Sequence, residues 1–156
     1  MSAPADDRIE KTITLTRLFD APPSLMFELF TRPEHLNRWW GPECFTASRA
    51  EVDLKVGGAW KLMMSGEPLG DGWVRGVYRE IDPPVRLVFT CDAISPGGAV
   101  MLEGLTIIEF ADRGGRTHVT VTVTASGPAF MAPALAGTEQ GWSEQLDKLA
   151  RYAAEL

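Results

Sequence analysis

Alternating apolar and polar positions mark the first predicted element of the chain. In the stretch KTITLTRLF, Ile13, Leu15 and Phe19 share one face, and threonines occupy the other. This period of two is typical of a half-buried β-strand. We expect residues 1–11 to be a disordered lead-in. The remainder shows no repeat and no linker, so residues 12–156 are predicted to form a single domain.

Two short helices are expected next. The proline pair in DAPPSLMFELFTR suits a helix start, and an apolar stripe at helical spacing runs from Leu25 to Phe30. Pro33 ends this helix because proline cannot continue the ladder of backbone hydrogen bonds. The stretch PEHLNRWW then fits a second short helix, which Gly41 and Pro42 stop.

The middle of the chain predicts about six further strands. The candidates are FTASRAEVDL, AWKLMMS, WVRGVYREI, VRLVFTCD, LEGLTIIEF and THVTVTVTA. Turn segments rich in Gly and Pro separate them, among them the hairpin loop GEPLGDG. In AWKLMMS, the side chains of Trp60, Leu62 and Met64 fall on one face. Valines and threonines alternate in THVTVTVTA, which is the clearest strand of the set.

The last segment predicts a long helix. Trp142, Leu146, Leu149 and Ala153 recur at the spacing of one helix face. A strand, two short helices, a run of strands and a long helix indicate an α+β fold with an antiparallel sheet of about six to seven strands. One helix cannot cover such a twisted sheet completely. We therefore expect the sheet to curl around the helix and to leave a pocket between them.

Composition narrows the classes of partner. The chain has 156 residues, of which 45% are hydrophobic and 23% charged, and its net charge is -6. An acidic surface disfavours nucleic acid, whose phosphates require basic residues. No stretch is apolar enough for membrane insertion, and the N-terminus lacks the apolar core of a secretory signal. The expected compartment is the cytoplasm, where Cys44 and Cys91 should remain free thiols.

The motifs of metal sites and of common catalytic sites are missing from the sequence. His35 and His118 are the only histidines, and neither belongs to a Cys/His cluster. There is no GxSxG elbow, and GDGWVRG leads into a strand, whereas a phosphate-binding glycine loop opens a helix. We expect no metal, no cofactor and no assigned catalytic residue. Cys91 is interpreted as a small buried residue rather than a nucleophile.

Two charged side chains are candidates for the pocket interior. Arg17 lies on the nominal apolar face of the first strand, and Glu80 lies near the end of the stretch GVYREI. A charge on an inner face must be paired or must serve a ligand. For Arg17 we favour a structural salt bridge. Either group could instead supply a polar function to an enzyme that uses the pocket.

The element order resembles a known family when it is taken together with the stretches TRLFDAPPSLMFELFTRPEHLNRWWGP, VGGAW, GVYREIDPPVRLVFT and GWSEQLDKLARYAAEL. This is the activator of heat-shock-protein-90 ATPase homologue-like family of the SRPBCC (START-like and Bet v-like) helix-grip superfamily. The resemblance runs from about Thr12 to Tyr152. It implies a curved antiparallel sheet around the C-terminal helix, an apolar cavity and a homodimer. The eukaryotic co-chaperones behind the family name carry an additional N-terminal domain that is not seen before residue 12, so no chaperone partner is expected.

The same resemblance places the helix of Trp39 and Trp40 at the cavity mouth. Adjacent residues of a helix cannot face the same way, so one indole should pack in the core and the other should line the pocket. Trp40 is favoured for the lining; the alternative is that both are packing residues. The predicted ligand-binding residues are Phe30, Trp40, Trp60, Leu62, Met64, Trp73, Tyr78, Phe89, Cys91, Met131, Leu135 and Trp142.

The sequence therefore favours a non-catalytic module that binds a small apolar or amphipathic molecule between the sheet and the C-terminal helix. Two alternatives stay open. An enzyme with cyclase-like or hydrolase-like activity would place a strongly perturbed carboxylate or a paired charge deep in the pocket. A chaperone-associated or dimerising interaction domain would expose an apolar patch beyond what the core requires.

Overall fold

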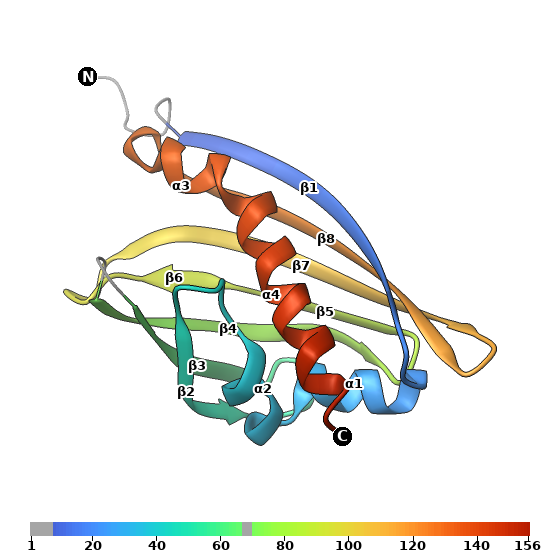
Figure 1. Ribbon diagram of the computed structural model, residues 1–156. Coiled ribbons are helices and arrows are strands. Elements are labelled where there is room, and N and C mark those ends of the chain that lie inside the picture. The colour runs from blue at the N-terminus through green and yellow to red at the C-terminus, as the bar shows by residue number, and fades with distance from the viewer. Residues whose placement is uncertain (1–7, 67–69) are drawn as a thin grey trace.

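A strongly curved antiparallel sheet wraps around one long helix (Figure 1) in the computed structural model, which describes residues 8–66 and 70–156. The strands are β1 (Arg8–Phe19), β2 (Thr46–Val52), β3 (Ala59–Gly66), β4 (Gly70–Asp82), β5 (Arg86–Thr90), β6 (Asp92–Ile94), β7 (Val100–Arg113) and β8 (Arg116–Pro128). The helices are α1 (Pro23–Thr31), α2 (Pro33–Trp39), α3 (Ala132–Ala136) and α4 (Thr138–Ala153), with a short 3-10 turn, η2 (Ala129–Met131), before α3. The predicted α+β helix-grip architecture is confirmed.

The sheet runs in the order β1-β8-β7-β5-β4-β3-β2, and the three-residue β6 pairs with β4 and β7. β1 and β8 pair over their whole length, from Arg8 opposite Pro128 to Phe19 opposite Thr117. This pairing corrects the predicted lead-in: residues 8–11 belong to β1 because β8 is long enough to supply their partners. Residues 1–7 lie outside the described residues, as do residues 67–69 of the predicted hairpin loop.

The helix boundaries follow the proline and glycine positions. α1 begins at Pro23, and Arg32 is extended between α1 and α2, as expected for a residue that precedes proline. The C-terminal helical segment is divided in two. Gly137 separates the short α3 from α4, so the long amphipathic helix covers residues Thr138–Ala153.

At the end of the sheet that α1 covers, aromatic and aliphatic side chains pack against one another. The rings of Phe27 and Phe30 lie 5.5 and 5.6 Å from that of Phe110 on β7. From the other side, α4 contributes Leu146 and Leu149, which are fully buried in the same hydrophobic cluster. α3 and the beginning of α4 lie near the opposite end of β1 and β8 (Figure 1).

Candidate functional site

A cavity of about 350 Å³ lies between the sheet and the first half of α4. Its lining is predominantly apolar and comes from the loop after α2, from five strands, and from α3 and α4. The lining residues are Trp40, Pro42, Phe45, Met64, Val74, Cys91, Ala93, Leu102, Glu103, Gly104, Thr106, Val123, Ala125, Ala134, Gly137, Thr138, Gly141, Trp142 and Gln145. The pocket predicted between the sheet and the C-terminal helix is present.

Small residues create the space for this cavity. On the sheet, the lining includes Ala93, Gly104 and Ala125, at positions where a larger inward side chain would fill the interior. On the helical side, Gly137 and Gly141 belong to the lining, and neither places a side chain in the cavity. Because side-chain volume fills the interior elsewhere, the small residues leave a gap that the fixed backbone cannot close.

Aromatic rings form one wall of the cavity. The ring of Trp40 lies 5.5 Å from that of Trp142 in an edge-on arrangement, and 5.5 Å from the ring of Trp60. Trp39 is completely buried, and its indole Nε1 donates a 2.8 Å hydrogen bond to the carbonyl oxygen of Leu29. Both tryptophans belong to the hydrophobic core, and Trp40 in addition borders the cavity.

The polar side chains of the lining are few. Glu103 is the one charged residue among the described residues of the lining, and its carboxylate pairs at 2.8 Å with Arg8 on the outer face of the sheet. Gln145 is 5% exposed, and its Oε1 accepts a 2.8 Å hydrogen bond from the backbone N–H of Gly41. Its Nε2 has no hydrogen-bond partner among the described residues. An unpaired buried amide is costly, so this group is unusual in a protein interior.

The loop that carries Pro42 and Phe45 is held against α4 by polar contacts. Nζ of Lys148 donates to the carbonyl oxygens of Pro42 and Phe45, at 3.4 and 3.0 Å. Arg151 pairs with Glu43 at 2.7 Å. Burial lowers the pKa of Lys148, and the Glu43 carboxylate acts in the opposite direction. α4 therefore lines the cavity and also positions the loop that forms one edge of it.

Four of the predicted ligand-binding residues line the cavity: Trp40, Met64, Cys91 and Trp142. Trp60, Phe30, Tyr78 and Phe89 instead pack with Trp40 around a gap of about 10 Å³. Leu62 and Leu135 are buried in the core, and Met131 lies in η2 outside the lining. Side-chain alternation alone could not separate these core positions from lining positions, because both face inward.

Trp73 was predicted to bind the ligand, and the structure places it on the other face of the sheet. Trp60, Leu62 and Met64 face inward on β3, and in the β3–β4 register Trp73 lies opposite the intervening Met63. Nζ of Lys61 instead lies over the Trp73 ring, 4.9 Å from the ring centroid. The prediction was wrong because Trp73 was grouped by residue type, whereas the register decides its face.

The two polar cavity candidates also lie outside the cavity. Arg17 faces α4, where it donates a 2.7 Å hydrogen bond to Oγ of Ser143 and lies 3.6 Å from Asp147. The favoured structural salt bridge is therefore the one observed. Glu80 is exposed and pairs at 3.2 Å with Arg86 on the outer face, so its predicted inward orientation was wrong.

Cys91 is the lining residue with nucleophilic potential. Burial, together with a smaller contribution from the adjacent Asp92 carboxylate, raises the pKa of its thiol to about 12. A reactive cysteine requires the opposite shift, towards the thiolate form. In this site Cys91 therefore acts as a small apolar group, in agreement with the sequence interpretation.

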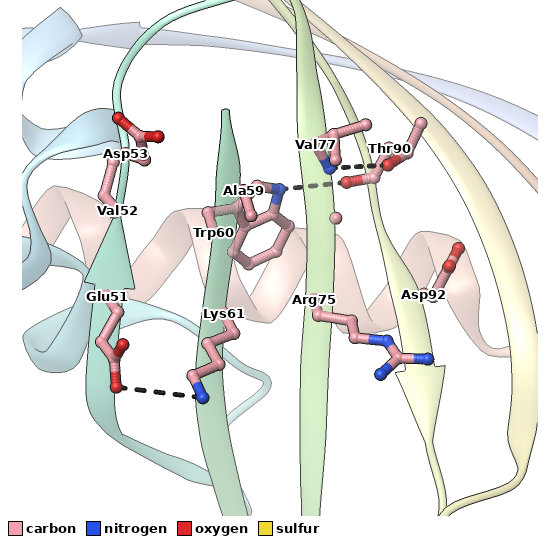
Figure 2. Close-up of a pocket in the computed structure, with 11 residues that line it drawn as sticks. Glu51, Val52, Asp53, Ala59, Trp60, Lys61, Arg75, Val77, Thr90 and Asp92 are labelled. Atoms are coloured by element: carbon pink, nitrogen blue, oxygen red, sulfur yellow. Dashed lines mark hydrogen bonds and ion pairs between the residues drawn. The ribbon is translucent and has the colours of Figure 1, made fainter. Parts of the chain in front are cut away.

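A second hollow, of about 630 Å³, opens over β2, β3, β4 and the β5–β6 junction (Figure 2). A charged row crosses it: Glu51, Lys61, Arg75 and Asp92 follow one another through the strand register. Figure 2 also shows Nε1 of Trp60 reaching the carbonyl oxygen of Thr90, at 3.1 Å. This hollow is larger than the cavity under α4, but Trp60 is the one aromatic residue among its described lining residues and solvated charges border it, so the cavity is the better candidate site.

Other kinds of site find no support in residues 8–66 and 70–156. In those ranges no group of three or more His, Cys, Asp and Glu side chains could hold a metal ion. His35 lies beside Tyr152, with 2.6 Å between its Nδ1 and the tyrosine hydroxyl. Within the same ranges, no helix has the length and apolar character needed to cross a membrane.

A curved antiparallel sheet that grips a C-terminal helix around an apolar cavity defines a protein of the SRPBCC helix-grip type. The family model described as activator of Hsp90 ATPase homolog 1-like protein matches residues 20–154, and the chain belongs to that family. A comparison with curated proteins gave no match.

Solved structures of bacterial proteins share this fold. Protein CV1439 from Chromobacterium violaceum is 28% identical, with a TM-score of 0.77 over 90% of this chain and 95% of that chain. Protein Mll3558 from Rhizobium loti is 25% identical, with a TM-score of 0.78 over 96% and 99% of the two chains. A putative uncharacterized protein from Rhizobium leguminosarum has a TM-score of 0.83 at 19% identity, over 96% and 97%, which shows the fold alone.

The sequence interpretation missed Gln145 and the small lining residues. Gln145 directly precedes Leu146 and follows Trp142 by three positions, so it lies on the apolar face of α4. A polar residue within an apolar helix stripe is a signal that could have been read. The small residues, such as Ala125, gave no comparable signal because a small inward residue is equally common in a filled core.

Proposed function

We propose that this protein is a binding module for a small, mostly apolar molecule, held in the cavity between the sheet and α4. The observation that carries the proposal is the apolar cavity of about 350 Å³ with Trp40 and Trp142 in its wall. Binding sites for small organic molecules commonly have volumes of about 300–1,000 Å³ and mostly apolar walls. The cavity lies at the small end of this range, which favours a compact ligand.

The enzyme alternative has less support from the same site. Arg17 and Glu80, its proposed polar groups, both lie outside the cavity. The Cys91 thiol is stabilised in its protonated form, and Glu103 is neutralised by Arg8 on the outer face. A binding role requires none of these groups to react.

The experiment is a titration with 2-ethylnaphthalene, a compact aromatic hydrocarbon, followed by calorimetry and by shifts of backbone amide resonances. We expect the largest shifts at cavity residues such as Ala125 and Trp142. An Ala125→Leu variant, which fills the cavity, should lose binding by at least about tenfold. Thr122→Leu is the matched control, since it adds bulk to the same strand on its other face. Equal binding by the two variants would refute the proposed site.

Native mass spectrometry of gently purified protein provides an independent test. A bound mass that is released on denaturation would identify the class of ligand that the cavity retains. The expected homodimer, the expected lack of a chaperone partner and the cytoplasmic location remain separate predictions. Light scattering would test the first, an Hsp90 ATPase assay with added protein the second, and fractionation of cells the third.

A further inference from the structure

The side-chain amide of Gln145 gives the cavity a chemical preference; this inference rests on the proposed function. Gln145 lines the cavity from α4 and is 5% exposed. Its Nε2 has no hydrogen-bond acceptor in the part of the chain that the structure describes. Buried polar groups are nearly always paired in native proteins, so an unpaired donor at a cavity wall points to an acceptor supplied by a ligand.

The orientation of this amide follows from its other partner. The backbone N–H of Gly41 lies 2.8 Å from Oε1 of Gln145. A backbone N–H can only donate, so the oxygen of the side chain must face Gly41. The alternative orientation would set two donors against each other, which excludes an exchange of the amide oxygen and nitrogen. Nε2 is therefore the atom of Gln145 that remains for a molecule in the cavity.

The charges around the cavity select a neutral acceptor over an anion. No lysine, arginine or histidine is among the described residues that line it, and the carboxylate of Glu103 lies on the outer face with Arg8. Lys148 follows Glu144 by one turn of α4. Its Nζ already donates to the carbonyl oxygens of Pro42 and Phe45. A carboxylate in the cavity would lose its hydration without gaining a counter-charge, which is strongly unfavourable.

A carbonyl fits the unpaired donor better than a hydroxyl does. A carbonyl oxygen requires only a donor, whereas a hydroxyl also brings its own O–H, which needs a buried acceptor. We propose that the cavity takes a neutral, mostly apolar molecule with a ketone, ester or amide carbonyl, to which Nε2 of Gln145 donates. The apolar part of the molecule then contacts the wall that Trp40 and Trp142 form.

Three naphthalenes that differ in one substituent test this preference. 2-Acetylnaphthalene carries the carbonyl, 2-ethylnaphthalene lacks it, and 2-naphthoate carries an anion. One added hydrogen bond in a dry site predicts that the ketone binds about tenfold tighter than the hydrocarbon. The naphthoate should bind more weakly than the ketone. The side-chain amide protons of Gln145 should move further downfield with the ketone than with the hydrocarbon, because only the ketone adds a hydrogen bond to the shared ring-current effect.

A Gln145→Met variant preserves the size of the side chain and removes the donor. It should reduce the preference for the ketone to within about twofold, because the hydrogen bond then no longer contributes. Gln140→Met is the matched control: Gln140 is exposed on the same helix, and its amide pairs with Glu144. The control should retain the full preference for the ketone.

The outcomes separate this inference from the proposed function. Equal affinities of the wild-type protein for the ketone and the hydrocarbon, or tightest binding of the naphthoate, would overturn the role of Gln145 and leave the binding function in place. Failure of the hydrocarbon and the ketone alike would overturn the proposed function and the inference with it. If Gln145→Met does not fold, the wild-type affinity ratio and the amide shifts still decide the question.

Discussion

The interior of this protein has two halves that share the same strands and the same helix but are filled differently. In the packed half, which α1 covers, Val121 of β8 and Leu146 of α4 are completely buried. In the cavity half, Val123 and Ala125 of β8 line a space of about 350 Å³. A shift of two to four residues along one strand therefore separates a filled core from a candidate binding site.

The difference lies in side-chain size and not in backbone architecture. β7 and β8 pair without a register shift from Glu103 opposite Ser126 to Arg113 opposite Arg116, so both halves rest on one regular ladder. The residue type at each inward position sets the side-chain volume there, independently of its neighbours on the strand. A helix-grip fold can thus keep its stability in one half while the other half varies in the shape and polarity of its cavity.

Truncation of leucine should have its largest effect in the packed half. Leu146→Ala removes a fully buried side chain and creates a new cavity, at an expected cost of about 2–5 kcal/mol in the free energy of unfolding. Leu102→Ala, in the cavity half, enlarges a space that already exists and should cost about 1–2 kcal/mol. Urea denaturation measures both values, and equal losses would remove the distinction between the halves.

Periodicity in the sequence was sufficient to predict the inward-facing residues of the packed half. The inward face of β8 follows from the alternation in THVTVTVTA, and the buried face of α4 follows from the recurrence that includes Leu146 and Leu149. These patterns identify which residues face inward. They do not tell whether facing side chains meet, because that depends on the distance between sheet and helix and on the volumes opposite each position.

Part of the candidate site could not be predicted from the sequence for the same reason. Trp40 and Trp142 lie in the cavity lining, whereas Trp73 was misplaced because its strand register could not be fixed from alternation in one strand. The contact between Gly41 and Gln145 joins residues 104 positions apart. No local pattern encodes such a pairing, so the unpaired amide became visible only in the folded chain.

Added volume should act in opposite directions in the two halves. Val121→Ile inserts a methylene where no space exists and should destabilise the protein by about 1–3 kcal/mol. Ala125→Leu places its added carbons in the cavity, and their burial should stabilise the protein by about 1 kcal/mol. Thermal and urea denaturation of both variants test the contrast. A destabilised Ala125→Leu protein would mean that the cavity cannot accept added volume.

Buried polar groups should separate the halves by a smaller margin. In the packed half, Thr117 donates a 2.7 Å hydrogen bond to the carbonyl oxygen of Ala21, and Thr117→Val should cost about 1–2 kcal/mol because that oxygen loses its donor. Without ligand, Gln145→Met removes an unpaired donor but also the acceptor for Gly41. These effects oppose each other, so its stability should stay within about 1 kcal/mol of wild type. A larger loss would indicate that Nε2 is already paired in the free protein.

The pH dependence of stability gives the smallest expected effect and reports on the polarity of the cavity half. Burial raises the pKa of the Cys91 thiol to about 12 from an ordinary value of 9.0. The unfolded chain then loses this proton at lower pH than the folded chain. The stabilisation is fully present below pH 9 and is lost as the pH rises towards 12. Between pH 8 and 10 the free energy of unfolding should fall by about 1 kcal/mol from this group.

Cys91→Ala should remove that part of the pH dependence, whereas Cys44→Ala, at an exposed thiol, should retain it. Tyr78, whose pKa burial also raises, titrates equally in both variants and cancels in their difference. If Cys91→Ala and Cys44→Ala have the same profile, water reaches the thiol, and the cavity is more polar than its lining indicates.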